Sequence, residues 1–326
     1  MANTTTSQKN SNSIESKFRR ISKNPNFGVF MILFVLCILL SIASDKFFTQ
    51  QNLFSVMRAF SYIAIIAIGQ CLVIISGGVD LSVGSVYGFS GLMTAFLMQK
   101  AGFAIPLGIT GGLAVGTALG MANGMLITKV RIPPFIATLG MLSVTRGLSY
   151  ALTTGYPIRT GKVFNTIGQG YFWIIPLPVV YMVVLGTIFT VFLNRTVTGR
   201  RIRAIGGNEE AAKVSGININ NVKLVVYSLC GLLSAVAGIA TTARLGVAQS
   251  TSGMGYELDA IAAVIIGGAS LSGGKGTILG AILGAAIMGV LKNGLILLNV
   301  SAYWQQTVLG LVVLLAIAAD QFRKRY

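Results

Sequence analysis

Long apolar runs separated by short polar stretches are the feature that most constrains this chain. A helix needs about 20 mostly apolar residues to cross a bilayer, and it must satisfy its own backbone hydrogen bonds there. The predicted spans, with bounds open by a few residues, are Gly28–Ser44, Ala59–Ser76, Ser82–Met98, Ala104–Thr128, Phe135–Leu152, Ile174–Leu193, Val222–Ala243, Leu258–Gly268, Thr277–Leu298 and Tyr303–Ala319. The sequence therefore predicts an all-α, polytopic transmembrane bundle of about ten spans. Eight or nine full spans are the alternative, because Leu258–Gly268 is short enough to be a broken or re-entrant element.

Composition supports a membrane location and excludes several classes of function. Charged residues make up 10% of the chain and hydrophobic residues 54%, whereas soluble domains carry about 25% charged residues. There is no histidine, so imidazole catalysis and His-ligated metal sites are excluded. Cys37, Cys71 and Cys230 lie singly in apolar runs and are interpreted as packing residues. We expect no catalytic residue, no metal site and no cofactor in this chain.

The distribution of Lys and Arg predicts an orientation. The net charge is +17, and cytoplasmic loops of membrane proteins carry an excess of basic residues. With the N-terminus inside, most Lys and Arg fall in the predicted cytoplasmic segments, and the outer ones are Lys46, Arg58, Lys100, Arg159 and Lys162. This bias explains the charge without a nucleic-acid partner. We expect both termini in the cytoplasm, with tails at 1–27 and 320–326 around a transmembrane domain at 28–319.

A glycine-rich pattern occurs twice between apolar runs. Gly77–Gly84 and Gly267–Gly274 both read GGxxLSxG. Matched breaks in transporter helices often mark the transport pathway, although glycine–serine turns also recur by chance. The predicted topology puts both copies on the cytoplasmic side, which does not fit a simple inverted repeat. Either the copies are unrelated or one turn lies deeper in the membrane.

The longest predicted cytoplasmic loop, 194–221, contains a short helix. Its sequence is Asn208-Glu209-Glu210-Ala211-Ala212-Lys213-Val214-Ser215-Gly216. Asn208 is a good N-cap, and acidic residues in the first turn suit the helix dipole. Gly216 is placed to end the helix in the left-handed conformation. A small-faced helix exposed to the cytoplasm is suited to a groove on another protein, and a plain capped connector is the alternative.

The spacing Glu210-Ala211-Ala212-x-x-x-Gly216 is similar to the EAA signature of ABC importer permeases. Other segments also resemble the ribose-type monosaccharide permeases of that class: Asp80–Ser85, Pro134–Leu139, Val226–Leu233, Ala243–Leu245, Gly255–Val264 and Gly273–Gly276. The similarity covers nearly the whole chain from Phe47 on, and the downstream Pro of the fuller EAA signature is absent. Xylose, galactose and autoinducer-2 permeases share much of the pattern.

This resemblance implies a permease subunit of the cell inner membrane and a set of partners. In the family the Asn208–Gly216 segment is the coupling helix that docks on the ATPase subunit, and that subunit binds the ATP. An extracytoplasmic binding protein delivers the monosaccharide, and a second permease copy completes the membrane channel, with a homodimer expected. Ribose is the leading sugar.

Polar residues inside the predicted spans are candidates for the pathway or its gate, because charges in lipid are costly. The candidates are Asp80, Asn123, Arg146 and Asn293, together with Gln70 and Gln305. Asp80 could instead cap the third span, and the amides could simply bond neighbouring helices. Arg146 is a lone charge in the fifth span, so we expect it to face the bundle interior or a carboxylate such as Asp80.

Three further charges are predicted at the outer ends of spans seven and eight. Glu257 and Asp259 could cap the eighth span, they could pair with Arg244, or the three charges could contact the delivering receptor. Separately, Gly112, Gly116, Gly120 and Gly124 share one face of the fourth span, which predicts close packing against another helix.

Two other function classes compete with the permease hypothesis. An ion-coupled secondary transporter would also be polytopic but would lack the EAA-type loop. An intramembrane enzyme is disfavoured because the chain lacks histidine and paired carboxylates deep in its spans. Ala269–Thr277 fails the G-x-x-x-x-G-K-[ST] pattern of a nucleotide-binding loop, so we expect ATP hydrolysis to reside on a partner.

Overall fold

The computed structural model describes residues 25–325, with side chains described as far as residue 318. Its helices are α2 (Pro25–Ala43), α3 (Gln50–Ile75), α4 (Val83–Gln99), α5 (Ile105–Thr128), α6 (Pro134–Thr153), α7 (Lys162–Gln169), α8 (Leu177–Arg195), α9 (Val197–Gly207), α10 (Glu209–Val214), α11 (Ile219–Leu245), α12 (Tyr256–Ile266), α13 (Ile278–Leu297) and α14 (Ala302–Arg325). Short strands are β1 (Ile158–Arg159), β2 (Tyr171–Phe172), β3 (Ile175–Pro176) and β4 (Val247–Ala248). The predicted N-terminal tail lies outside the described residues except for 25–27. The predicted C-terminal tail continues α14 as far as Arg325.

The helices confirm the predicted polytopic bundle. Within the described part of the chain, seven helices are long and apolar enough to cross a membrane, namely α2, α3, α5, α6, α8, α11 and α13. The apolar part of α14 is slightly shorter, at Ala302–Ala318. Two predicted spans are shorter helices: α4 has 17 residues and α12 has 11. At about 1.5 Å per residue, α12 reaches roughly half of a 30 Å hydrocarbon core.

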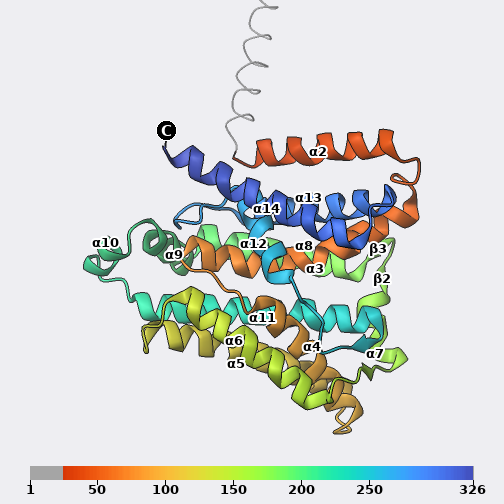
Figure 1. Cartoon of the computed structure of the whole chain (residues 1–326). Helices are drawn as coiled ribbons and strands as arrows, with labels where there is room; N and C mark the ends of the chain where they lie inside the picture. The colour runs from red at the N-terminus through yellow and green to blue at the C-terminus, as the bar shows by residue number, and fades with distance from the viewer. Residues whose placement is uncertain (1–24, 326) are drawn as a thin grey trace, which may run out of the picture.

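The long helices α3 and α11 form the centre of the bundle (Figure 1). Most of the apolar window of α3 is buried, and its residues from Ser61 to Ile75 are covered on every side, because the helix is apolar all round. On α11 the small residues face α5. A Cβ added to Gly116 would lie 2.5 Å from the Cβ of Ala235. The predicted close packing of the glycine face of α5 is therefore confirmed: Gly120 and Gly124 meet α11, and Gly112 and Gly116 meet both α4 and α11.

The two short helices α4 and α12 meet inside the bundle by their N-termini. The chain leaves α3, turns through 76–82 and starts α4 within the protein, while the 249–255 segment runs inward from β4 to the start of α12 (Figure 1). A Cβ on Gly84 would collide with Glu257 and with the carbonyl oxygen of Gly253. Irregular backbone at this depth is tolerated where protein covers it.

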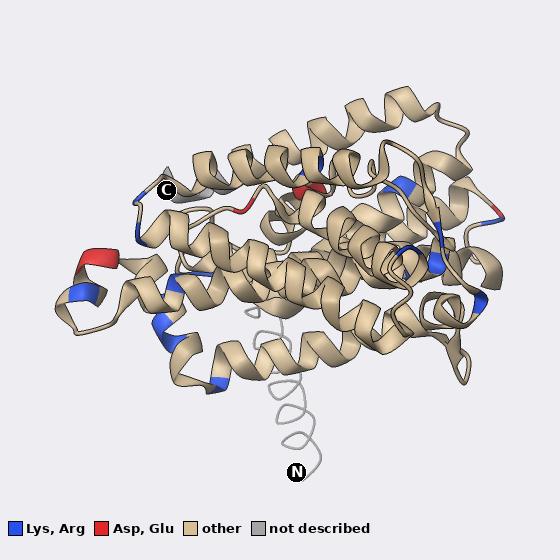
Figure 2. Cartoon of the chain, turned by 90° about the horizontal axis from the view of Figure 1, so that it is seen from below, with Lys and Arg blue, Asp and Glu red and all other residues tan. Residues whose placement is uncertain are grey.

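The bundle has two structurally different ends. We call them the α10 end, where α9 and α10 project, and the α7 end, where α7 lies beside the β1–β4 and β2–β3 pairs (Figure 1). Antiparallel pairing joins Ile158 to Ala248 and Tyr171 to Pro176. Figure 2 shows that most Lys and Arg lie toward the two ends, with few charged residues along the helices between them. This separation is what a bilayer imposes on a spanning protein.

Candidate functional sites

The helix α10 is defined at both ends by local hydrogen bonds. The side-chain oxygen of Asn208 accepts from the backbone N–H of Ala211 at 2.9 Å. At the other end, Gly216 has φ +79°, its N–H donates to the Lys213 carbonyl, and the N–H of Ile217 donates to the Ala212 carbonyl. This pair of bonds around a left-handed glycine is the Schellman motif. The predicted N-cap and glycine stop are both confirmed.

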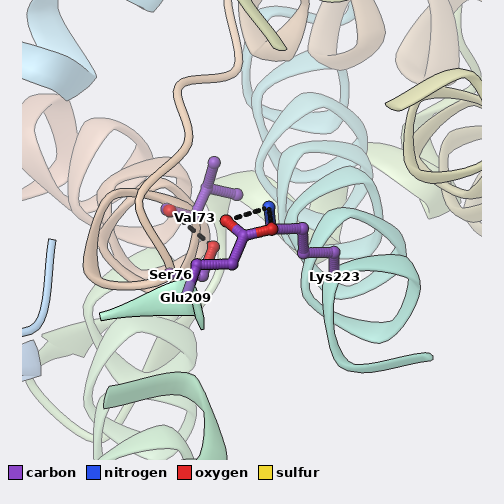
Figure 3. Close-up of polar contacts among 4 residues, drawn as sticks. All are labelled: Val73, Ser76, Glu209 and Lys223. Atoms are coloured by element: carbon purple, nitrogen blue, oxygen red, sulfur yellow. Dashed lines mark hydrogen bonds and ion pairs between the residues drawn. The ribbon is translucent and has the colours of Figure 1, made fainter. Parts of the chain in front are cut away.

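One face of α10 is attached to the bundle and the other is exposed. Ala212 is 4% exposed, and the carboxylate of Glu209 binds the Lys223 ammonium of α11 at 2.7 Å (Figure 3). On the outer face Val214 is 88% exposed, beside Ala211 and Glu210. The sequence analysis did not single out Val214. On a helix, a residue two positions after the buried Ala212 lies on the opposite side, so Val214 faces away from the bundle.

A cleft of about 580 Å³ lies behind α10. The turn between α5 and α6 forms one wall, including Arg131 and Pro133. Glu210 and Lys213 of α10 and Lys223 of α11 form the other wall. A partner that covers α10 would therefore also meet the α5–α6 turn.

A buried polar network surrounds Asp80 at the start of α4. Its carboxylate accepts from the Ser82 N–H at 2.8 Å and from the Ser82 hydroxyl at 2.6 Å. Asn123 of α5 donates to the Ser82 hydroxyl at 2.8 Å, and the Gln70 amide of α3 pairs with the Asp80 main chain at 3.2 Å. The N-cap of α4 is Ser82, so Asp80 holds the approach to the helix by accepting two hydrogen bonds from that residue.

Arg146 does not pair with Asp80, so that predicted partnership is wrong. The Arg146 guanidinium of α6 donates to the carbonyl oxygens of Ser250 and Ser252, at 2.7 and 2.8 Å. Asp80 meanwhile is enclosed by Ser82 and its neighbours. Arg146 thus holds the 249–255 segment against α6. The carbonyls of an irregular segment have no helical donor, and this leaves them available to an arginine.

The charges of α12 also differ from the prediction. The start of α12 lies inside the bundle rather than at an outer end, and Asp259 is 8% exposed. Asp259 forms an ion pair with Lys292 of α13, and Arg244 lies over the ring of Tyr62 at 5.8 Å. The predicted pairing of Arg244 with Glu257 and Asp259 is therefore wrong. Short helix α12 starts mid-bundle, and this brings its acidic first turn to α13 instead of α11.

The remaining amides bond neighbouring elements. Asn293 of α13 and Asn52 of α3 form two reciprocal hydrogen bonds, at 2.7 and 3.1 Å. Gln305 donates to the carbonyl of Val300 at 2.8 Å. Asn123 is fully buried within the Asp80 network. Within the described part of the chain, no group of three or more His, Cys, Asp or Glu side chains is arranged to hold a metal ion.

Comparison with known proteins places the chain in a family. Residues 52–317 match the model described as "Branched-chain amino acid transport system / permease component". The chain is 45% identical to the ribose import permease RbsC of Escherichia coli K12, over 88% of this chain and 91% of that protein. It is 46% identical to RbsC of Bacillus subtilis 168, over 90% and 92% of the two chains. The D-allose permease AlsC of Escherichia coli K12 is 36% identical, over 90% and 91%.

No solved structure matches the chain. The relatives cover most of the sequence, and the family model at 52–317 includes α10 and both short helices. A bundle of apolar helices with one capped helix projecting from its end agrees with a subunit of this kind. The chain therefore belongs to the family of transport-system permease components, as a multi-pass protein of the inner membrane.

Proposed function

We propose that this chain is the membrane-spanning permease of an ATP-driven importer, and that ribose is the sugar it moves. The observation that carries the proposal is α10, a helix with ordered caps and an exposed small-residue face, in a chain 45% identical to a ribose import permease. Relatives named for D-allose and L-arabinose are 36% identical. The higher identity to the ribose permeases supports ribose among these pentoses and hexoses.

The ATPase subunit docks on α10 from the cytoplasm. In this orientation the α10 end faces the cytoplasm and both termini lie on that side, which the basic residues of α9 and its neighbours support. Glu210, Ala211 and Val214 form the exposed contact face, and the adjoining cleft admits part of the ATPase beside the α5–α6 turn. ATP is bound and hydrolysed by the partner, so this chain carries no cofactor.

The binding protein docks at the α7 end. The basic residues predicted to lie outside belong to this end: Arg58 stacks on Tyr171 of β2 at 4.6 Å, and Lys100 and Arg159 line a cleft of about 590 Å³. A basic surface fits a partner with an acidic rim and speeds their encounter. The buried position of Asp259 makes it unsuitable for this contact, and Arg244 is the one of the three predicted docking residues that lies at this end.

A second copy of the chain covers α6, and the sugar passes along this face. Arg146 is only half-buried within one chain, and a charge at membrane depth avoids lipid by facing protein or a water-filled path. Gly140 and Gly147 lie on α6 with no atom within 4 Å of an added Cβ. The face is therefore open to close approach by another helix. Arg146 is the pathway residue in this arrangement, whereas Asp80, Asn123 and Asn293 shape the helices behind it.

Reconstituted transport tests the proposal. The chain is placed in proteoliposomes with its ATPase and binding protein, and uptake of labelled ribose is measured with and without ATP. We expect uptake only with ATP and both partners, and competition by unlabelled ribose stronger than by allose, arabinose, xylose or galactose. Uptake that persists without ATP and the ATPase would contradict the proposal and favour an ion-coupled transporter.

A pair of valine variants tests the docking face. Val214→Asp places a charge on the exposed face of α10, and Val163→Asp makes the same change on α7 at the opposite end, where Val163 is 71% exposed. We expect Val214→Asp to weaken capture of the ATPase by the detergent-solubilised permease, because a charge is desolvated in the contact. Val163→Asp should leave capture unchanged. Equal capture by both variants would contradict docking at α10.

A further inference from the structure

Three backbone segments meet at Gly206 without side chains between them. The N–H of Gly274 donates to the carbonyl oxygen of Ile75 at 2.9 Å. Gly206 lies against both, and a Cβ added to it would overlap the Ile75 oxygen and lie 2.5 Å from the Gly274 nitrogen. A Cβ on Gly273 would lie 2.6 Å from the Gly206 oxygen. The contact therefore depends on glycine on both sides.

The three segments adjoin the proposed docking helix α10 and the two short helices, α4 and α12. Gly206 and Gly207 end α9, and Asn208 follows as the N-cap of α10. Ile75 ends α3 and precedes the 76–82 turn into α4. Gly273 and Gly274 lie in the connection between α12 and α13. One point thus joins the docking helix to the connections of both short helices, α4 and α12.

The same contact brings together parts of the two GGxxLSxG copies. Gly77, at the start of the first copy, and Gly273 and Gly274, at the end of the second, lie beside Gly206 at the α10 end. The first copy then runs inward, because Gly84 meets Gly253 and Glu257 at the start of α12. An added Cβ on Gly77 would be 3.9 Å from the Gly206 Cα. The copies do not serve equivalent helices, because the first precedes the short helix α4 and the second follows the short helix α12.

The contact is stiff on the α3 side. The Ser76 hydroxyl donates to the Val73 carbonyl oxygen at 2.7 Å (Figure 3). The Ser76 N–H donates to the Leu72 carbonyl oxygen, so the last turn of α3 is closed by hydrogen bonds. Backbone atoms in direct contact have no rotamers with which to absorb a displacement, and packed interiors transmit strain. A shift of α9 is therefore passed to Ile75 and to the 273–274 turn.

We propose that Gly206 is a positioning residue for transport: it passes the displacement of α10 directly to the backbone of α3 and of the α12–α13 connection. This rests on the proposed function, in which the ATPase moves α10. The glycine stripe of α5, in contrast, is packed against α11 and has no contact of this kind with α10.

Neighbouring glycines provide the test. Gly206→Ala adds one methyl group at the contact, whereas Gly207→Ala adds the same group where no atom lies within 4 Å. Both variants are reconstituted with the ATPase and binding protein, and ribose uptake and ATP hydrolysis are measured together. We expect Gly206→Ala to keep ATPase capture and hydrolysis but to move about tenfold less sugar per ATP. Gly207→Ala should match the unmodified chain.

Equal sugar-to-ATP ratios in the two variants would overturn the proposal. If the unmodified chain itself shows no ATP-dependent uptake, the proposed function fails instead, and the two failures are thereby distinguished.

Hydrogen exchange on the unmodified chain gives a second measurement that stands even if Gly206→Ala does not fold. Amide exchange is compared with and without the bound ATPase. We expect ATPase binding to change exchange in peptides covering 72–77 and 269–276, together with those covering α9 and α10. Changes confined to α9 and α10 would overturn the proposal.

Discussion

Lys292 of α13 forms an ion pair with Asp259 of α12 inside the bundle. The Asp259 side chain is 11% exposed and that of Lys292 is 29% exposed. The ammonium of Lys292 also lies 5.9 Å from the ring of Tyr256, at the start of the same short helix. The pair therefore fixes the acidic first turn of α12 against a full-length span.

Removing one partner of this pair is expected to destabilise the protein. Lys292→Ala leaves the Asp259 carboxylate largely buried without its cation, at a cost of about 3 kcal/mol or somewhat less, since Lys292 is partly exposed. The measurement is thermal unfolding in detergent, with Lys275→Ala in an exposed loop as the matched control. A double variant with Asp259→Leu and Lys292→Leu should recover most of the loss. No difference between Lys292→Ala and Lys275→Ala would contradict the prediction.

Arg146 is expected to act through the 249–255 segment and not through Asp80. Arg146→Ala removes charged donors from the carbonyls of Ser250 and Ser252, at about 1.5–3 kcal/mol for each bond to a charged group as an upper range. We expect lower thermal stability and a loss of ribose uptake in proteoliposomes. Because the two charges are not partners, the double exchange Arg146→Asp with Asp80→Arg should recover none of the uptake lost in the single variants. Recovery would show that they interact.

The N-cap of α10 is expected to affect ATPase binding without affecting the bundle. Asn208→Ala removes the acceptor for the Ala211 N–H, which costs about 1 kcal/mol of helix stability. If α10 must be helical to dock, ATPase affinity falls about fivefold, measured by titration of the solubilised permease. Asn208→Ser keeps an N-cap acceptor and should bind nearly as well as Asn208. Unfolding temperature should be the same in all three proteins, and equal affinities would contradict the role of the cap.

The glycines of α5 and α14 are expected to differ in their tolerance of a methyl group. A Cβ on Gly120 would overlap the Tyr227 carbonyl oxygen of α11, whereas a Cβ on Gly310 of α14 meets nothing within 4 Å. Gly120→Ala should destabilise the solubilised protein by about 1–3 kcal/mol through overpacking. Gly310→Ala should be neutral or stabilising by up to about 1 kcal/mol, because alanine favours helix. Thermal unfolding in detergent compares the two, and similar shifts would contradict the packing of α5 on α11.

Much of the secondary structure could be predicted because it depends on local chemistry. An apolar run of spanning length has to form a helix in a bilayer, so Ala104–Thr128 in the sequence agrees with Ile105–Thr128 in α5. The caps of α10 could likewise be predicted, because Asn208 and Gly216 form their hydrogen bonds with residues only a few positions away in the sequence. Bounds differed most at α3, which begins at Gln50 instead of Ala59, because its polar first turns lie beyond the apolar run.

The partners of the buried charges could not be predicted from the sequence. Arg146 binds carbonyls that are 104 and 106 residues away, and Asp259 meets Lys292 across 33 residues. Such pairings depend on the depth at which each helix starts, and α4 and α12 start inside the bundle instead of at its ends. Hydropathy measures length and polarity along the chain and carries no information on which turns lie side by side.

By itself, then, the sequence determined that the chain crosses a membrane many times, and that a capped helix interrupts the crossings. Burial of apolar side chains and satisfaction of backbone groups are properties that each segment carries alone. Tertiary structure decided that Val214 points outward, that Asp80 is enclosed by Ser82 and its neighbours, and that Gly206 touches Ile75. Those facts arise only from packing, because contact between distant segments is set by all the helices together.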